Sequence, residues 1–221
     1  MSRRKANVQK RPGSAQYDRD MIPVTRRRPI AFALFSIVAG AVGWFASFEL
    51  LTEFIKTLKN PDYVPNCAVS LLVTCGPNME APQGSVFGFS NTILGVAAFV
   101  APIAVGVALL AGARFDRWFW WLYQLGLLGG IVFVFWLFTQ SVFSLGTLCP
   151  WCMVVWTVTI PLFWITLFRP YAVGDIPVSQ PVRRVFAALY SWSWVIVLVC
   201  YLVIAFVAQL QLDWFAEFRR M

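Results

Sequence analysis

The sequence has no histidine and little charge. Of its 221 residues only 13% are Asp, Glu, Lys or Arg, which is about half the charged fraction of a typical soluble domain. Without imidazole the chain lacks the commonest general base and the commonest nitrogen ligand of zinc. The lack of histidine therefore disfavours serine hydrolase triads and histidine-containing metal sites. The low charge disfavours a soluble globular fold.

Long apolar runs take the place of charge. Hydrophobic residues make up 59% of the chain, and the mean hydropathy is +0.69. A bilayer requires runs of about 20 apolar residues, which are rare in soluble proteins. The sequence predicts an all-α integral membrane protein with one transmembrane domain over residues 30–210. The expected spans lie at about 30–54, 92–113, 118–138, 151–168 and 185–207.

The segments outside these spans are polar. Residues 1–29 are basic and poor in aliphatic side chains, which predicts a disordered tail. Residues 56–89 form a long loop rich in Pro, Asn and Gly, and loops of that length are usually functional or disordered. A short tail follows at 211–221. Within the third span, Gly126 and Gly130 have the spacing of close helix packing.

Basic residues are divided unevenly between the two predicted sides. Nine of the 18 lie in the first 28 positions, and with the N-terminus inside, 14 fall on the inner side and four on the outer side. This asymmetry predicts a cytosolic N-terminus and an extracytoplasmic C-terminus in a multi-pass protein of the plasma (inner) membrane. The tail has no aromatic residues interleaved in a nucleic-acid-binding pattern, so lipid headgroups rather than nucleic acid are its expected contact.

Four of the five cysteines form two close pairs. Cys67 and Cys75 lie in the long loop, and Cys149 and Cys152 lie in a Cys-Pro-Trp-Cys motif at the start of the fourth span. The predicted topology places both pairs on the extracytoplasmic side, where disulfides persist. The fifth, Cys200, is expected to behave as a small apolar residue in the last span.

The spacing of Cys149 and Cys152 has a chemical rationale. At a helix start, unpaired N–H groups and the positive end of the helix dipole stabilise a thiolate, which lowers the pKa of the first cysteine. Pro150 suits the first helical turn, and Trp151 adds an apolar wall beside the sulfurs. These features predict thiol–disulfide exchange. There are three alternatives: a metal site made of four cysteines, a chance C-x-x-C, and a purely structural Cys67–Cys75 disulfide. The spacing of the loop cysteines is not that of a zinc ribbon, so no metal is expected.

The arrangement resembles the vitamin K epoxide reductase family in its bacterial, actinobacterial-type form. The resemblance covers roughly residues 30–168. It rests on Asn66-Cys67 and Cys75-Gly76, on the Gly-Ser-Val-Phe-Gly-Phe segment at 84–89, and on the Cys-Pro-Trp-Cys motif that follows. The order of the pairs is informative, because the other membrane family that forms disulfides has its C-x-x-C pair first.

The resemblance implies a four-transmembrane-helix bundle around a quinone, with a fifth transmembrane helix added. Cys149 and Cys152 would be the catalytic pair, with Cys152 nearest the quinone. Cys75 would exchange with Cys149, and Cys67 with Cys75 would form the shuttle pair. The quinone is expected to be menaquinone or ubiquinone, and its expected contacts are Phe87, Ser85, Trp151 and Trp156.

The chain departs from the family pattern at three places, one of which is Gly84, where some members have a polar residue. The serine or threonine usual five or six residues after the second loop cysteine is replaced by Glu80 and Ala81. Trp156 stands where some members have a tyrosine.

The resemblance also implies a function. The protein would oxidise a separate extracytoplasmic thioredoxin-like (DsbA-like) partner, since no thioredoxin-like domain precedes Met221, and would pass the electrons to membrane quinone in support of disulfide formation. A monomer is expected. The alternatives are a quinone or vitamin K epoxide reductase with quinol as its product, and a non-enzymatic, disulfide-stapled membrane protein. Against a transporter, no charged residue lies mid-span.

Overall fold

The computed structural model describes residues 29–70, 72–213 and 219. The expected disordered tail at 1–29 therefore lies almost wholly outside the described residues, as does most of 211–221. The described helices are α2 (Ile30–Lys59), α3 (Gly76–Glu80), η1 (Pro82–Ser85), α4 (Asn91–Ala98), α5 (Val100–Leu110), α6 (Arg117–Thr139), η2 (Gln140–Leu145), α7 (Pro150–Val173), α8 (Gln180–Ser191) and α9 (Ser193–Leu212).

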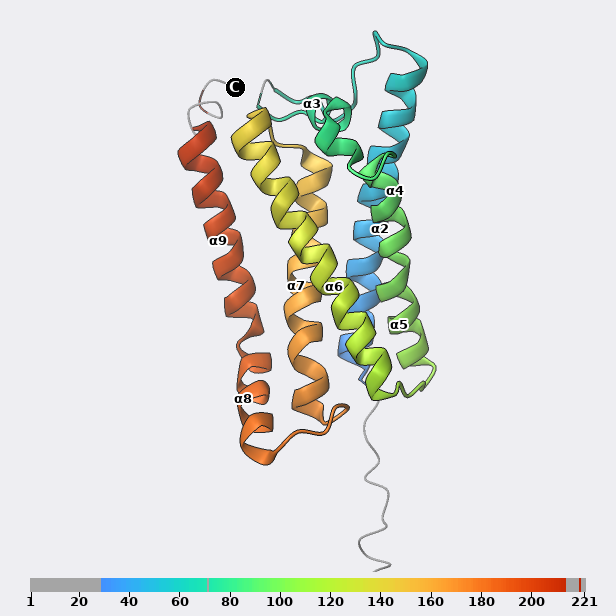
Figure 1. The fold of residues 1–221 in the computed structure, drawn as a ribbon, viewed down its shortest axis with the longest axis vertical. Coiled ribbons are helices and arrows are strands. Elements are labelled where there is room, and N and C mark those ends of the chain that lie inside the picture. Colours follow the sequence, from blue (N-terminus) through green and yellow to red (C-terminus); the bar gives the residue numbers. More distant parts are fainter. Residues whose placement is uncertain (1–28, 71, 214–218, 220–221) are drawn as a thin grey trace, which may run out of the picture.

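The predicted all-helical membrane fold is confirmed. Five helical stretches are long and apolar enough to cross a bilayer: α2, α4 with α5, α6 with η2, α7 and α9. The first four stand together as a bundle, and α9 stands at its edge (Figure 1). The loop after α2, with α3, covers one end of the bundle, here called the cysteine end because it holds Cys67, Cys75 and Cys149.

Glycines allow α2 to pack closely against α4 and α5. A Cβ atom on Gly43 would overlap the ring of Phe99, and one on Gly106 would lie 2.6 Å from the carbonyl oxygen of Ala33. Gly126 and Gly130 behave differently, because a Cβ atom on either would have no neighbour within 4 Å. The expectation that these two glycines pack against another helix of the chain is therefore wrong for the described residues; the spacing alone does not say which way the helix face points.

Two prolines inside α7 are matched by side chains from neighbouring helices. A proline removes the N–H that would bond to the carbonyl four residues earlier. Pro161 thus frees the carbonyl of Thr157, which accepts a hydrogen bond from the hydroxyl of Tyr201 in α9. Pro170 frees the carbonyl of Thr166, which accepts a hydrogen bond of 3.4 Å from Gln124 in α6. Side-chain hydrogen bonds from α6 and α9 therefore join the bundle at the positions where α7 lacks a backbone hydrogen bond.

The expected span at 185–207 is divided between two helices. α8 ends and α9 begins around Trp192. On either side of the break, Ser191 donates to the carbonyl of Ala188 and Ser193 donates to that of Tyr190. Such bonds compete with the regular backbone pattern and bend helices. The predicted span therefore includes the end of α8, whereas the apolar stretch long enough to cross a bilayer is α9.

Candidate redox site

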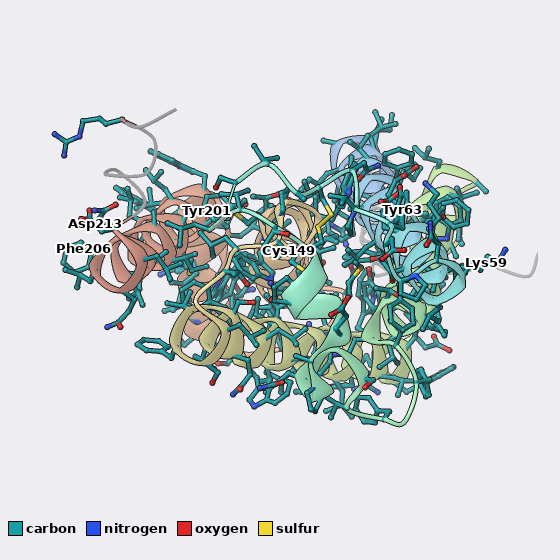
Figure 2. All side chains as sticks on the ribbon, turned by 90° about the horizontal axis from the view of Figure 1, so that it is seen from above. Lys59, Tyr63, Cys149, Tyr201, Phe206 and Asp213 are labelled. Atoms are coloured by element: carbon teal, nitrogen blue, oxygen red, sulfur yellow. A yellow bond between two sulfur atoms is a disulfide. The ribbon has the colours of Figure 1, made fainter. Side chains whose placement is uncertain are left out.

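The catalytic-type motif lies where a sharp turn delivers the chain to α7. The π-helical η2 ends at Gly146, whose φ of 67° favours glycine. Three residues later, Cys149 is the N-cap of α7 and Pro150 is its first residue, as the motif predicted. Viewed from the cysteine end, Cys149 lies near the middle of the bundle (Figure 2).

A short backbone pairing joins the loop to this segment. Val73 and Leu148 form a parallel bridge. The N–H of Thr74 donates to the carbonyl of Leu148 at 3.0 Å, and the N–H of Leu148 donates to the carbonyl of Leu72 at 2.7 Å. Because these residues directly precede Cys75 and Cys149, the pairing fixes the register of the two cysteines.

The sulfur atoms form a nearly continuous chain. Cys67 and Cys75 are joined by a disulfide, and the Sγ of Cys149 lies 3.2 Å from the Sγ of Cys75. Cys75 and Cys149 are fully buried, and Cys67 is 4% exposed. Cys149 and Cys152 are free thiols. The structure thus places a thiol beside the disulfide that it could attack.

The surroundings of Cys149 favour its thiolate. A hydrogen bond from the Cys152 thiol, together with the backbone N–H groups of Cys152 and Trp151, lowers the pKa of Cys149, although burial opposes this effect. Nucleophilic attack needs the thiolate, so the lowered pKa favours reaction at neutral pH. Within the described part of the chain, no group of three or more acidic, cysteine or histidine side chains is arranged to hold a metal ion.

A polar bridge centred on Asn78 strengthens the junction between the loop and the motif. Its amide donates to the hydroxyl of Thr147 at 2.9 Å, and its carbonyl oxygen accepts from Ser141 at 2.6 Å. Asn78 belongs to α3, which begins directly after Cys75. The bridge therefore holds the helix behind Cys75 against the segment that leads to Cys149.

A pocket opens beside Cys152. Its walls combine apolar side chains with amide and hydroxyl groups, and its lining residues are Leu50, Asn78, Met79, Gly84, Ser90, Asn91, Thr92, Leu137, Ser141, Cys152 and Trp156. A quinone ring needs apolar walls and hydrogen-bond donors for two carbonyl oxygens, and this set of groups supplies both. The lining therefore has the kinds of groups that a quinone head group needs, beside the sulfur of Cys152.

Of the four expected quinone contacts, only Trp156 is among the lining residues of this pocket. It is 5% exposed, and its ring meets Phe138 edge-on at 5.4 Å. Trp151 instead packs against the buried sulfurs and against Phe45. Phe87 is 59% exposed and contacts Phe89 and Phe133. Ser85 ends the short helix η1 at the pocket's edge, one residue after the lining Gly84.

Sequence reasoning did not find the polar lining of the pocket. Its amides and hydroxyls come from Asn78, Ser90, Asn91, Thr92 and Ser141. Asn78 stands three residues after Cys75, and its partners Ser141 and Thr147 lie more than 60 residues away. The available signal was weak: polar residues close to each cysteine pair, without a spacing that says which of them meet.

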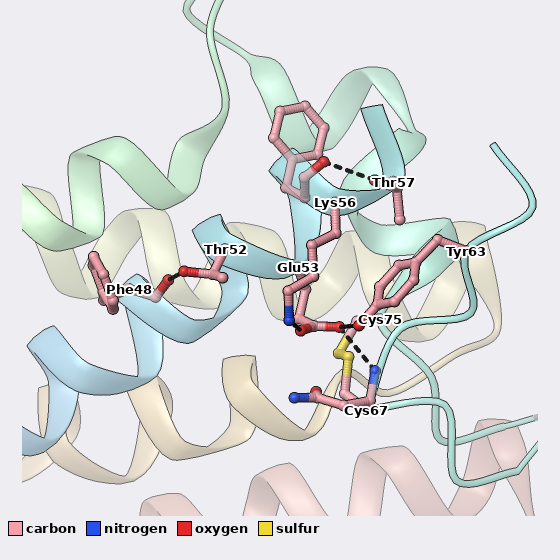
Figure 3. A network of polar contacts seen from close by, with 10 residues as sticks. Phe48, Thr52, Glu53, Lys56, Thr57, Tyr63, Cys67 and Cys75 are labelled. Atoms are coloured by element: carbon pink, nitrogen blue, oxygen red, sulfur yellow. Dashed lines mark hydrogen bonds and ion pairs between the residues drawn. A yellow bond between two sulfur atoms is a disulfide. The ribbon is translucent and has the colours of Figure 1, made fainter. Parts of the chain in front are cut away.

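A carboxylate that the sequence did not single out lies behind the loop disulfide. Glu53, near the end of α2, is fully buried. Its oxygens accept hydrogen bonds from Lys56 Nζ at 2.7 Å, from the Tyr63 hydroxyl at 3.0 Å and from the backbone N–H of Asn66 at 2.8 Å. Figure 3 shows this group, here called the Glu53 clamp, next to the Cys67–Cys75 disulfide.

Comparison with known proteins agrees with this geometry. The family model described as "Vitamin K epoxide reductase family" matches residues 34–167, which is more than half of the chain and includes all four paired cysteines. A search of curated proteins gave no significant match. The matched family is an all-helical membrane fold whose members are redox enzymes with reactive cysteines, are generally associated with quinones and typically act with thioredoxin-like partners. The chain therefore belongs to the vitamin K epoxide reductase family and is a membrane oxidoreductase.

Proposed function

We propose that the protein oxidises dithiols outside the cytoplasm and passes their electrons to membrane quinone. One observation carries this proposal. The disulfide Cys67–Cys75 touches Cys149, and the partner of Cys149 in the motif, Cys152, lines a pocket whose groups suit a quinone. The sulfurs thus connect the loop at the cysteine end with the pocket inside the bundle.

Electrons enter at the loop pair. An outside thiolate attacks the Cys67–Cys75 disulfide, and a second thiol of the same partner resolves the mixed disulfide, so that the partner is oxidised and both loop cysteines become thiols. The Cys75 thiolate then attacks Cys149 in a Cys149–Cys152 disulfide and displaces Cys152 as a thiolate. Attack of Cys67 on the Cys75–Cys149 link restores the loop disulfide and leaves two thiols in the motif, which is the state that the structure describes.

The last transfer takes place at the pocket. When bound, a quinone accepts two electrons and two protons. Cys152 would face it as the donor sulfur, and the amide N–H groups of Asn78 and Asn91 that are not bonded to Thr147 and Gln83 would hold its oxygens. Leu50, Met79, Leu137 and Trp156 exclude water from the ring. The Cys149–Cys152 disulfide forms again as the two electrons leave.

The direction in which the protein faces follows from charge. Nine basic residues precede α2 in the sequence, and Arg114, Arg117, Arg169, Arg183 and Arg184 lie toward the end of the bundle opposite the cysteines; both favour a cytosolic N-terminus and an extracytoplasmic cysteine end. A thioredoxin-like protein of that compartment suits the loop pair as a partner, because such proteins present an accessible dithiol.

An anaerobic titration tests the proposal. Purified protein in detergent is mixed with quinone and dithiothreitol, and quinol formation is followed by absorbance. We expect the native chain to reduce quinone, and the Cys152→Ala variant to lose this activity and to accumulate the Cys75–Cys149 disulfide. The Cys67→Ala variant should keep part of its activity with dithiothreitol and lose it with a protein dithiol. Quinol formation that survives in Cys152→Ala would contradict the assignment.

The same residues would serve a reductase whose useful product is quinol. The direction of electron flow depends on the reduction potentials of the partners. Offering vitamin K epoxide in place of quinone in the same titration separates the two, since only a reductase of that class consumes the epoxide.

A further inference from the structure

The loop disulfide is less accessible than its role requires. Under the proposed function, an outside thiol must reach Cys67, yet Cys67 is 4% exposed while the neighbouring Asn66 and Ala68 are exposed. Its sulfur packs in a cluster that includes Leu50 and Met79. The segment around Cys67 must therefore shift before the first exchange takes place, and whatever holds that segment controls this step.

The Glu53 clamp is what holds it. Two of its three donors, the Tyr63 hydroxyl and the Asn66 N–H, belong to the loop, and Asn66 is the residue directly before Cys67. The third donor, Lys56, is bonded to the other carboxylate oxygen and also lies 5.6 Å from the Tyr63 ring centre. A fully buried carboxylate is costly unless several donors surround it, so this site has been built around a negative charge.

The clamp acts on only one of the two exchange sites. Cys75 is held from another direction, by the backbone pairing of Val73 with Leu148 and by the Asn78 bridge. Neither of these involves Glu53. Loosening the clamp should thus free Cys67 and leave the contact of Cys75 with Cys149 in place.

We propose that Glu53 is a positioning residue that fixes the 63–67 segment against α2 and thereby sets how readily an outside thiol reaches the Cys67–Cys75 disulfide. The proposal rests on the function proposed above. In the step concerned, a dithiol is oxidised to its disulfide and delivers two electrons and two protons, and the Cys67–Cys75 bond becomes two thiols.

The test measures that step alone. In a variant with Cys149→Ala, Cys152→Ala and Cys200→Ala, the remaining cysteines are Cys67 and Cys75. Reduction of their disulfide by dithiothreitol is followed by trapping the free thiols with a maleimide of high mass. We expect Glu53→Gln to raise the reduction rate about tenfold, because an amide has one acceptor oxygen where the carboxylate has two, and a charge-assisted bond is lost. Tyr63→Phe, which removes one donor, should give a smaller increase.

Two controls make the result specific. Asp62→Asn changes an exposed carboxylate in the same loop that does not contact Glu53, and its rate should stay within about twofold of the parent, as for surface changes in general. In a separate Cys152→Ala background, Glu53→Gln should not lower the yield of the Cys75–Cys149 disulfide, because Cys149 attacks Cys75 and Cys67 is the group that leaves.

Equal or slower reduction in Glu53→Gln and Tyr63→Phe than in Asp62→Asn would overturn the proposal. So would a loss of the Cys75–Cys149 disulfide alongside faster reduction, since that pattern means that the whole cysteine end has loosened. No quinone is present in this assay. A negative result for Glu53 is therefore distinguishable from a failure of the native chain to form quinol, which would contradict the proposed function.

Discussion

At the scale of single residues, the site depends on the different surroundings of its sulfurs. Cys149 caps α7 and receives hydrogen bonds that favour its thiolate. Cys152, one helical turn further on, lies at the wall of the pocket. The same C-x-x-C motif therefore presents one sulfur to the loop and the other to the pocket, which allows a single pair to exchange with two different substrates.

The lowered pKa of Cys149 predicts a characteristic pH profile. Its exchange with the loop disulfide should speed up with pH only as far as the lowered pKa and be flat above it, because the thiolate is then fully formed. An unperturbed thiol would continue to gain rate up to about pH 8.5. The rate can be measured in Cys152→Ser by acid quenching, alkylation and gel shift of the Cys75–Cys149 form.

The matched variant is Cys152→Ala, which removes the hydrogen bond that lowers the pKa most. Its profile should level off at higher pH than that of Cys152→Ser. Identical profiles that both rise beyond about pH 8.5 would mean that this hydrogen bond does not tune Cys149.

At the scale of helices, α7 is the element on which the rest of the bundle depends. It carries the motif at its start, and its two interior prolines leave carbonyls that α6 and α9 satisfy with side chains. In a bilayer an unpaired carbonyl has no water to bind. Pro161 thus links the outlying helix α9 to the helix that begins with the Cys149–Cys152 motif.

This link predicts a coupling between Tyr201 and Pro161. Tyr201→Phe should lower the free energy of unfolding by about 1 kcal/mol, since it leaves the Thr157 carbonyl unpaired. Pro161→Ala restores a backbone N–H for that carbonyl, so in this background Tyr201→Phe should cost clearly less. Denaturation of the four proteins in mixed micelles provides the double-mutant cycle. Additive effects would show that the Tyr201 hydroxyl contributes nothing through Thr157.

At the scale of the whole molecule, the two ends of the bundle differ in chemistry. One end gathers the paired cysteines, the Glu53 clamp and the pocket, and the other carries the short connection at residues 111–116 and the turn before α8. The proposed function requires that the first end face the oxidising side of the membrane.

Labelling in whole cells tests this orientation. Lys59 lies at the cysteine end (Figure 2), and Arg114 is exposed at the opposite end. An impermeant maleimide should label Lys59→Cys in intact cells and Arg114→Cys only after permeabilisation, with the native chain as the blank. The reverse pattern would place the cysteines in the cytosol and contradict the proposed direction of electron flow.

The parts of this architecture that could be predicted are those written in local patterns. Apolar runs predicted the helical membrane fold, and the Cys149–Cys152 spacing predicted a cysteine pair at a helix start. The break at Trp192 was missed because serine hydroxyls, rather than hydropathy, interrupt the helix. The Asn78 bridge and the Glu53 clamp join segments that the Val73–Leu148 pairing brings together. A β-bridge of one residue pair produces no periodic sequence pattern, so these contacts could not be predicted.

The 3.2 Å contact between Cys75 and Cys149 has a consequence for fidelity. Reacting groups held in contact behave as if each faced the other at an effective molarity that can reach on the order of 10⁵ M. Soluble thiols in the surroundings are present at far lower concentration and must compete with a neighbour that never diffuses away. Under the proposed function, a loop thiol would therefore pass its electrons to the motif faster than it reacts with soluble thiols.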